Sequence, residues 1–121
     1  MNLTSIAKLL ENMADCEITI HTINRNFQKT LGVYPRRGAT PYSPEIGDLQ
    51  GFDLMPVTLI LRWGRNGVEA EEMAKKLYIS LENASLERGI LIHTNNAPIW
   101  LGADERGVFE YALDVDFFIK K

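Results

Sequence analysis

Histidine and cysteine are the side chains that most often serve as bases, nucleophiles or metal ligands, and this chain has two histidines and one cysteine. His21 and His93 each fall in a segment with the pattern of a strand. Either could act as a base if a carboxylate lay beside it, which keeps a small α+β enzyme as one functional class. No spacing links either histidine to a carboxylate, so a half-buried strand residue is the better interpretation of both. Cys16 has no base near it in sequence and is interpreted as a structural thiol.

The segment Gly64-Arg65-Asn66-Gly67 lies between a strand and a helix, where free backbone N–H groups could hold an anion. It has neither the glycine spacing of a dinucleotide site nor the Gly-Lys-Ser/Thr of a phosphate loop. Glu69 and Glu71 would repel a phosphate there. A turn followed by a helix cap is therefore expected, with Asn66 as the cap and Glu69 completing a capping box.

Charged side chains on the strands and loops could also bind partners. Arginines at 36, 37, 62 and 65 could form a basic patch, but such residues are more often solvated or paired with nearby acids such as Asp114 or Asp116. The acidic row Glu110, Asp114 and Asp116 could hold a divalent ion only with further oxygen ligands from a loop. We therefore predict no catalytic residue, no cofactor and no metal site, and we expect that the protein is not an enzyme.

Composition narrows the class further. The chain has 121 residues, 45% of them hydrophobic and 24% charged, which suits one domain with a buried core. Its 13 basic and 16 acidic residues give a net charge of -3, which does not favour nucleic-acid binding through bulk charge. A single cysteine excludes an internal disulfide and fits a reducing compartment. No apolar run approaches ~20 residues and the N-terminus lacks a signal pattern, so no membrane span or secretory signal is expected.

The stretch from Phe52 to Leu81 organises the chain. Residues 54–63 alternate as a strand with one apolar face, and residues 68–81 carry an apolar helical stripe that can pack on it. The strand face is Met55, Val57, Leu59, Leu61 and Trp63, and the stripe is Ala70, Met73, Ala74, Leu77, Tyr78 and Leu81. Further patterns predict a helix over 3–15 and strands over 17–24, 30–34, 90–94, 99–101 and 108–119.

The strand 108–119 has the strictest alternation, with an apolar face of Phe109, Tyr111, Leu113, Val115, Phe117 and Ile119. We predict an α+β fold in which an antiparallel or mixed β-sheet packs against two α-helices as a two-layer sandwich. One domain spans residues 1–121, with a long loop at about 35–51 rich in proline and glycine. Leu54, Ile60 and Phe118 lie on the second face of the sheet and require a cover, either the N-terminal helix or another chain.

Two stretches carry a resemblance to a known family. One is the run Gly51-Phe52-Asp53-Leu54-Met55-Pro56-Val57-Thr58-Leu59-Ile60-Leu61-Arg62-Trp63-Gly64-Arg65-Asn66, followed by Glu69-Ala70-Glu71 and Leu77-Tyr78. The other is Ala97-Pro98-Ile99-Trp100-Leu101-Gly102-Ala103-Asp104-Glu105-Arg106-Gly107-Val108-Phe109-Glu110-Tyr111, a glycine-bounded turn before a Tyr-bearing strand. The chain thereby resembles the minor capsid proteins of tailed phages and prophages, which group with tail terminator or tail completion proteins. These motifs are patterns of strands and turns and cover most of the chain.

The resemblance implies a tail-terminator-like fold and a structural role in the virion, assembled in the bacterial cytoplasm. Such proteins form a ring, usually hexameric, that caps the tail tube and joins it to the head connector, while DNA passes through the middle without sequence-specific binding. The free protein could be a monomer. A head–tail connector or adaptor protein of the same module is the alternative. The expected interface residues are Arg36, Arg37, Tyr42, Leu54, Ile60 and Arg62, and the expected channel-facing acids are Glu110, Asp114 and Asp116.

Overall fold

The computed structural model describes residues 3–14, 16–22, 29–35, 52–83 and 90–120. Two helices and six strands follow one another in the order α1 (Leu3–Glu11), β1 (Glu17–Ile20), β2 (Lys29–Pro35), β3 (Phe52–Trp63), α2 (Gly67–Asn83), β4 (Ile90–Thr94), β5 (Ile99–Ala103) and β6 (Phe109–Lys120). The predicted order of elements is confirmed. The first helix and first strand end earlier than predicted, at Glu11 and Ile20. The predicted loop at about 35–51 lies almost wholly outside the described residues.

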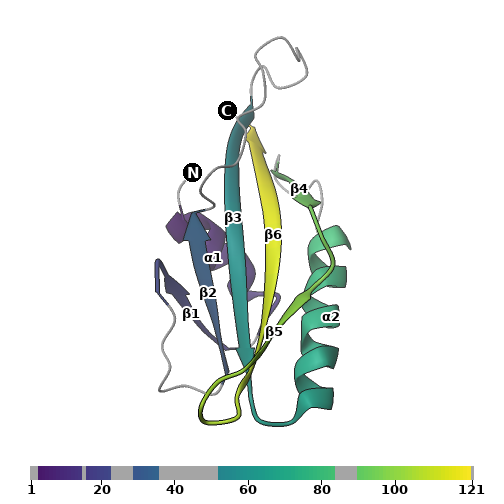
Figure 1. Cartoon of the computed structure of the whole chain (residues 1–121). Coiled ribbons are helices and arrows are strands. Elements are labelled where there is room, and N and C mark those ends of the chain that lie inside the picture. The colour runs from purple at the N-terminus through teal and green to yellow at the C-terminus, as the bar shows by residue number, and fades with distance from the viewer. Residues whose placement is uncertain (1–2, 15, 23–28, 36–51, 84–89, 121) are drawn as a thin grey trace.

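The strands form one open, mixed sheet in the order β1-β2-β3-β6-β4, with β5 also paired to β6 (Figure 1). The first two strands are parallel, and every other pair is antiparallel. The longest pairing joins β3 and β6, from Phe52 opposite Lys120 to Arg62 opposite Glu110. The α+β class with a mixed sheet and two helices is therefore confirmed.

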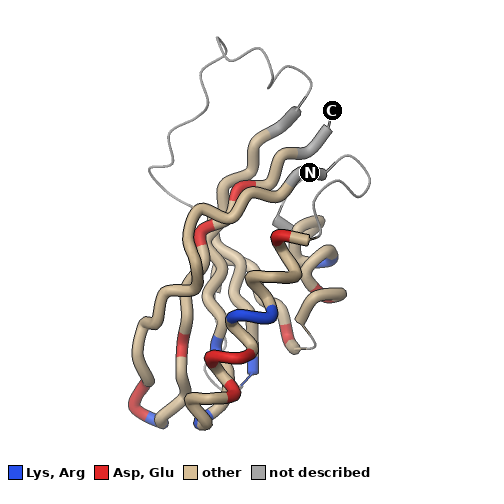
Figure 2. Tube along the Cα trace, turned by 90° about the vertical axis from the view of Figure 1, so that its right-hand side faces the viewer, with Lys and Arg blue, Asp and Glu red and all other residues tan. Residues whose placement is uncertain are grey.

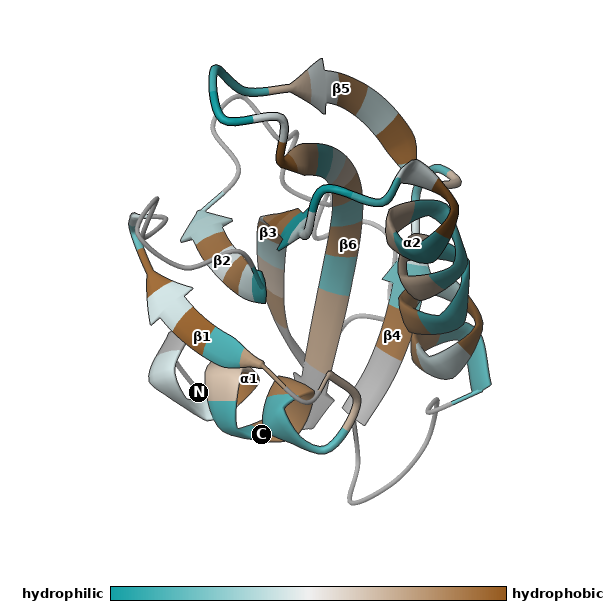
Figure 3. Ribbon diagram, turned by 90° about the horizontal axis from the view of Figure 1, so that it is seen from below, coloured by the Kyte–Doolittle hydropathy of each residue, from teal (hydrophilic) through white to brown (hydrophobic). Residues whose placement is uncertain are grey.

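Both helices cover the same face of the sheet (Figure 3). Ile6 and Leu10 of α1 pack in the core with Leu31 and Val33 of β2. The apolar stripe of α2 packs on β3, β6 and β4. Its buried members are Ala70, Met73, Ala74, Leu77 and Leu81. Since α1 lies on the same face as α2, the N-terminal helix does not cover the second face, which was one of the two covers expected.

The sequence predicts the dry face of each long strand well. Val57, Leu59 and Leu61 of β3 are buried, and so are their counterparts Leu113, Val115 and Phe117 of β6. Residues nearer the strand ends, such as Met55, Trp63 and Tyr111, are only partly buried and pack around the edge of the core. Burial on this face therefore decreases towards the strand ends, because the helices are shorter than the strands they cover.

Local hydrogen bonds explain where α2 begins. The Asn66 side-chain oxygen accepts from the backbone N–H of Val68 at 3.0 Å and of Glu69 at 3.3 Å. These bonds satisfy N–H groups of the first turn that have no partner within the helix. The predicted Asn66 cap is confirmed. Gly64 precedes it with a positive φ of 66°, a conformation that favours glycine.

Replacement of Leu77 tests the packing of α2. Leu77 is fully buried, and Ile79 on the same helix is 55% exposed. We expect Leu77→Ala to lower the free energy of unfolding by about 2–5 kcal/mol, because it removes buried methyl groups and leaves a cavity. Ile79→Ala is the matched control and should change it by no more than about 0.5 kcal/mol. Urea unfolding followed by circular dichroism measures both, and equal losses would contradict this packing.

Candidate functional site

A buried arginine marks the second face of the sheet, the face opposite the helices. Arg62 is 1% exposed, and its Nη1 lies 2.5 Å from Asp104 Oδ2 and 3.8 Å from Glu110 Oε2. A buried charge is costly unless it is paired, so these carboxylates are required by its position. Glu110 is its neighbour across the β3–β6 pair, whereas Asp104 comes from the connection after β5. The ion pair therefore ties the β5–β6 connection to the sheet.

Asp104 also shapes that connection. Its Oδ1 accepts hydrogen bonds from the backbone N–H of Arg106 at 2.8 Å and of Val108 at 3.0 Å. The bond from Val108, followed by those from the Arg62 side chain and from Arg106, lowers the pKa of Asp104 from 3.8 to about 2. One carboxylate thus closes the turn and neutralises the buried arginine.

The three predicted channel-facing acids all lie on the second face, and each has a partner within the chain. Glu110 lies near Arg62, as described above. Asp114 accepts from Thr58 Oγ1 at 2.7 Å, and Asp116 accepts from Asn95 Nδ2 at 3.2 Å. Asp116 is only 4% exposed. Within the described residues, the arginine that lies beside this acidic row is Arg62, which is next to Glu110. Their place along a channel stays a prediction.

The six predicted interface residues fall into three groups. Leu54 and Ile60 are half-buried on the second face. Phe118, the third apolar residue expected there, is 7% exposed and therefore buried. Arg62 is inside the protein and offers no surface for a partner. Arg36, Arg37 and Tyr42 lie outside the described residues. On the same face, Tyr34 covers Gly32 so closely that an added Cβ would lie 2.8 Å from its ring.

The outer edge beyond β6 is one interrupted strand. Thr94 pairs with Val115 and Ile99 with Ala112, so four residues, 95–98, face only two, 113–114. The backbone N–H of Asp114 donates to Asn96 Oδ1 at 3.2 Å, and Asn95 N–H donates to the Asp114 carbonyl at 2.9 Å. The Asn96 side chain therefore accepts the hydrogen bond from β6 that a strand carbonyl would accept if β4 continued into β5.

Strand β5 exposes three consecutive large apolar residues. Ile99, Trp100 and Leu101 are 51%, 61% and 53% exposed. The register shifts between Trp100 and Gly102, which leaves Leu101 as the unpaired residue of a bulge. Within the described residues, β5 pairs only with β6, so its outer edge offers unpaired backbone groups as well.

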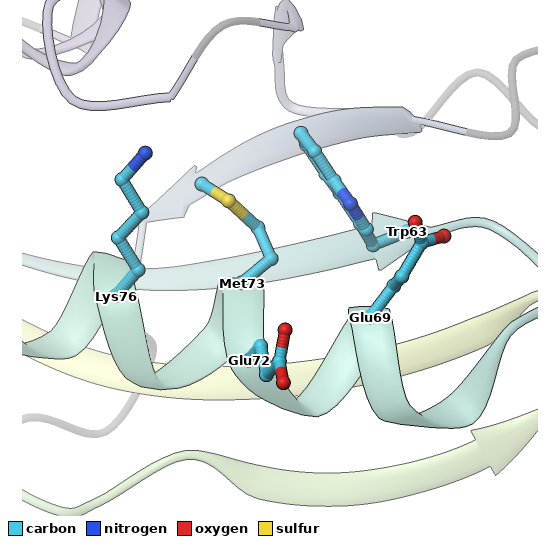
Figure 4. A pocket seen from close by; sticks show the side chains of 5 residues that line it. All are labelled: Trp63, Glu69, Glu72, Met73 and Lys76. Atoms are coloured by element: carbon cyan, nitrogen blue, oxygen red, sulfur yellow. The ribbon is translucent and has the colours of Figure 1, made fainter.

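A shallow depression lies on the helix-covered side of the sheet (Figure 4). Its volume is about 210 Å³, and its lining is Trp63, Glu69, Glu72, Met73 and Lys76. Lys29 Nζ lies 5.1 Å from the centre of the Trp63 ring, a cation–π contact that holds the indole in place. The volume is below the roughly 300–1,000 Å³ typical of small-molecule sites, so a single side chain suits this depression better than a metabolite.

Neither histidine lines the depression. His21 is exposed and adopts a positive φ of 64°, and its backbone N–H donates to the Val33 carbonyl at 2.9 Å. His93 is exposed and lies opposite Asp116 in the β4–β6 register. Among the residues that the structure describes, no three His, Cys, Asp or Glu side chains gather as a possible metal site. The described helices include none that is long and apolar enough to span a membrane.

Comparison of the sequence with models of known protein families gives no match, and comparison with curated proteins gives none either. The geometry of the chain is therefore the basis for assigning a function.

Sequence reasoning missed the roles of three features of the structure. It treated Asp104 as part of a polar turn, Trp63 as one more member of a dry face, and 99–101 as a minor extended piece. The run Ile99-Trp100-Leu101 did carry a signal, because three apolar residues in a row break the alternation of a half-buried strand. Only the structure shows that all three are exposed.

The pH dependence of stability tests the role of Asp104. Its pKa is lower in the folded chain, so it stabilises the fold above pH 3.8 and loses this effect as the pH falls through about 2. Asp104→Asn should therefore lose less stability than the wild type when urea midpoints at about pH 5 and about pH 2.5 are compared. Glu71→Gln, which removes an exposed carboxylate paired with Lys75, should behave as the wild type does. A wild-type dependence in Asp104→Asn would contradict the assignment.

Proposed function

We propose that this protein is a structural virion component of a tailed phage or prophage, a minor capsid or tail terminator protein with a tail-terminator-like fold. It assembles into a ring, usually of six subunits in such proteins, that caps the tail tube and joins it to the head. DNA passes through the ring without sequence-specific binding. The protein acts by docking onto other subunits and performs no catalytic turnover.

The observation that carries this proposal is the exposed apolar strand β5. Monomeric proteins seldom expose contiguous apolar groups unless they mark an interaction site. Edge strands that avoid partners often carry lysine, proline or inward charges. The five residues Ile99–Ala103 carry none of these, and although the strand is short and has a bulge at Leu101, three of its residues are large exposed apolar groups. A surface of this kind suits permanent association with another protein chain.

The second face supports the same proposal. Its half-buried Leu54 and Ile60 remain without a covering helix, since both helices pack on the other side. Of the nearby acids, Glu110 lies beside the Arg62 guanidinium and Asp116 is 4% exposed, so the half-buried Asp114 contributes most of the unpaired negative charge of that face. In a ring, such a face would repel DNA phosphates and allow the strand to slide. We assign Leu54 and Ile60 to subunit or tube contacts and the acids to the channel.

Assembly is the direct test of this function. We expect light scattering to detect rings of the purified protein, either alone or after mixing with the tail-tube protein of the same phage or prophage. Electron microscopy should then show rings at the ends of tubes. Binding to the head connector without binding to tubes would favour the adaptor alternative. A protein that stays monomeric under all these conditions would overturn the proposal, as would metabolite turnover lost in His21→Ala or His93→Ala.

A further inference from the structure

We propose that Trp100 of one copy inserts into the Trp63 depression of the next copy and so joins neighbouring subunits. The inference rests on the ring proposed above and identifies its contact. The β5 surface is defined here as Ile99, Trp100 and Leu101 with the exposed Glu105 and Arg106 of the following turn. The Trp63 depression is lined by Trp63, Glu69, Glu72, Met73 and Lys76.

The two surfaces are distinct patches on either side of β6, at the same end of the sheet. Strands β3 and β5 pair with opposite edges of β6, so Trp63 at the end of β3 and Trp100 on β5 are separated by β6. The side chains of Trp63, Met73 and Lys76 project to the same side of α2 (Figure 4). A contact between two different patches of one chain is head-to-tail, which is the geometry that builds rings or filaments.

Each of the two surfaces carries charges of both signs. The depression carries Glu69 and Glu72 together with Lys76, and the turn after β5 carries Arg106 together with Glu105. Figure 2 shows charged residues of both signs along α2 and at the turn between β5 and β6. Arg106 can therefore meet the glutamates while Glu105 meets the lysine. Opposite charges around an apolar centre set the orientation of two partners.

The apolar parts also suit each other. The depression has an aromatic ring and a methionine, a flexible side chain that adapts to the shape of a partner. Its volume of about 210 Å³ is on the scale of one large side chain. Trp100 is 61% exposed. Tryptophan is one of the residue types that contribute most of the binding energy at protein interfaces. The Trp100 side chain of the β5 surface and the Trp63 depression thus match in size and polarity between copies of this chain.

Substitution of Trp100 tests the energy of this contact. We expect Trp100→Ala to weaken assembly by at least about 10-fold, measured as the concentration at which light scattering detects rings. Arg106→Glu and Glu72→Lys should each weaken assembly, and the two together should restore much of it. The matched controls are Ile79→Ala, which removes an equally exposed apolar group, and Glu71→Lys, which makes the same charge change outside the depression. Both should assemble as the wild type does.

Cross-linking tests the geometry without touching the apolar pair. In a Cys16→Ser background, copies with Glu105→Cys are mixed with copies with Lys76→Cys and then oxidised. We expect a disulfide-linked dimer of the two variants, with several-fold less product when Lys75→Cys, on the same helix outside the depression, replaces Lys76→Cys. Rings that survive Trp100→Ala, or equal yields with the two lysine positions, would overturn this contact and leave the ring proposal standing. Absence of wild-type assembly would overturn both.

Discussion

The pairing of β3 with β6 is the interaction on which the rest of the structure depends. Each strand has 12 residues, and their antiparallel register runs almost end to end. It places Leu59 beside Leu113 on the helix-covered face and Arg62 beside Glu110 on the other. A slip of one residue would turn every side chain of one strand to the wrong face. Helix α2 and strands β2, β4 and β5 attach directly to this pair, whereas β1 pairs with β2 and α1 packs on β1 and β2.

The second face shows how the protein manages a face that neither of the two described helices covers. It is neither a polar, solvated surface nor a complete core. Arg62 is buried beneath Asp104, while Asp114 and Asp116 accept hydrogen bonds from side chains of neighbouring elements. These polar contacts hold the β5–β6 connection and the interrupted edge strand in place. As a consequence, the apolar residues of β5 are presented outward on a supported element, as a docking surface requires.

The same arrangement leaves large apolar side chains at the surface. Among the described residues, the large exposed apolar side chains are those of β5, Val68 and Ile79. A chain that exposes tryptophan and isoleucine at a sheet edge gains free energy chiefly by covering them with another chain. The proposed head-to-tail contact would cover the exposed Trp100 of one copy and fill the Trp63 depression of the next.

The sequence by itself determined the helices, the strands and their dry faces, because the spacing of apolar residues reflects the local period of each element. The capping role of Asn66 was equally local and could be predicted. Tertiary structure alone decided the strand order, the parallel pairing of β1 with β2, the burial of Arg62 and the exposure of β5. These features depend on residues far apart in the chain, such as Arg62 and Asp104, and no local period records which distant strand or side chain becomes a neighbour.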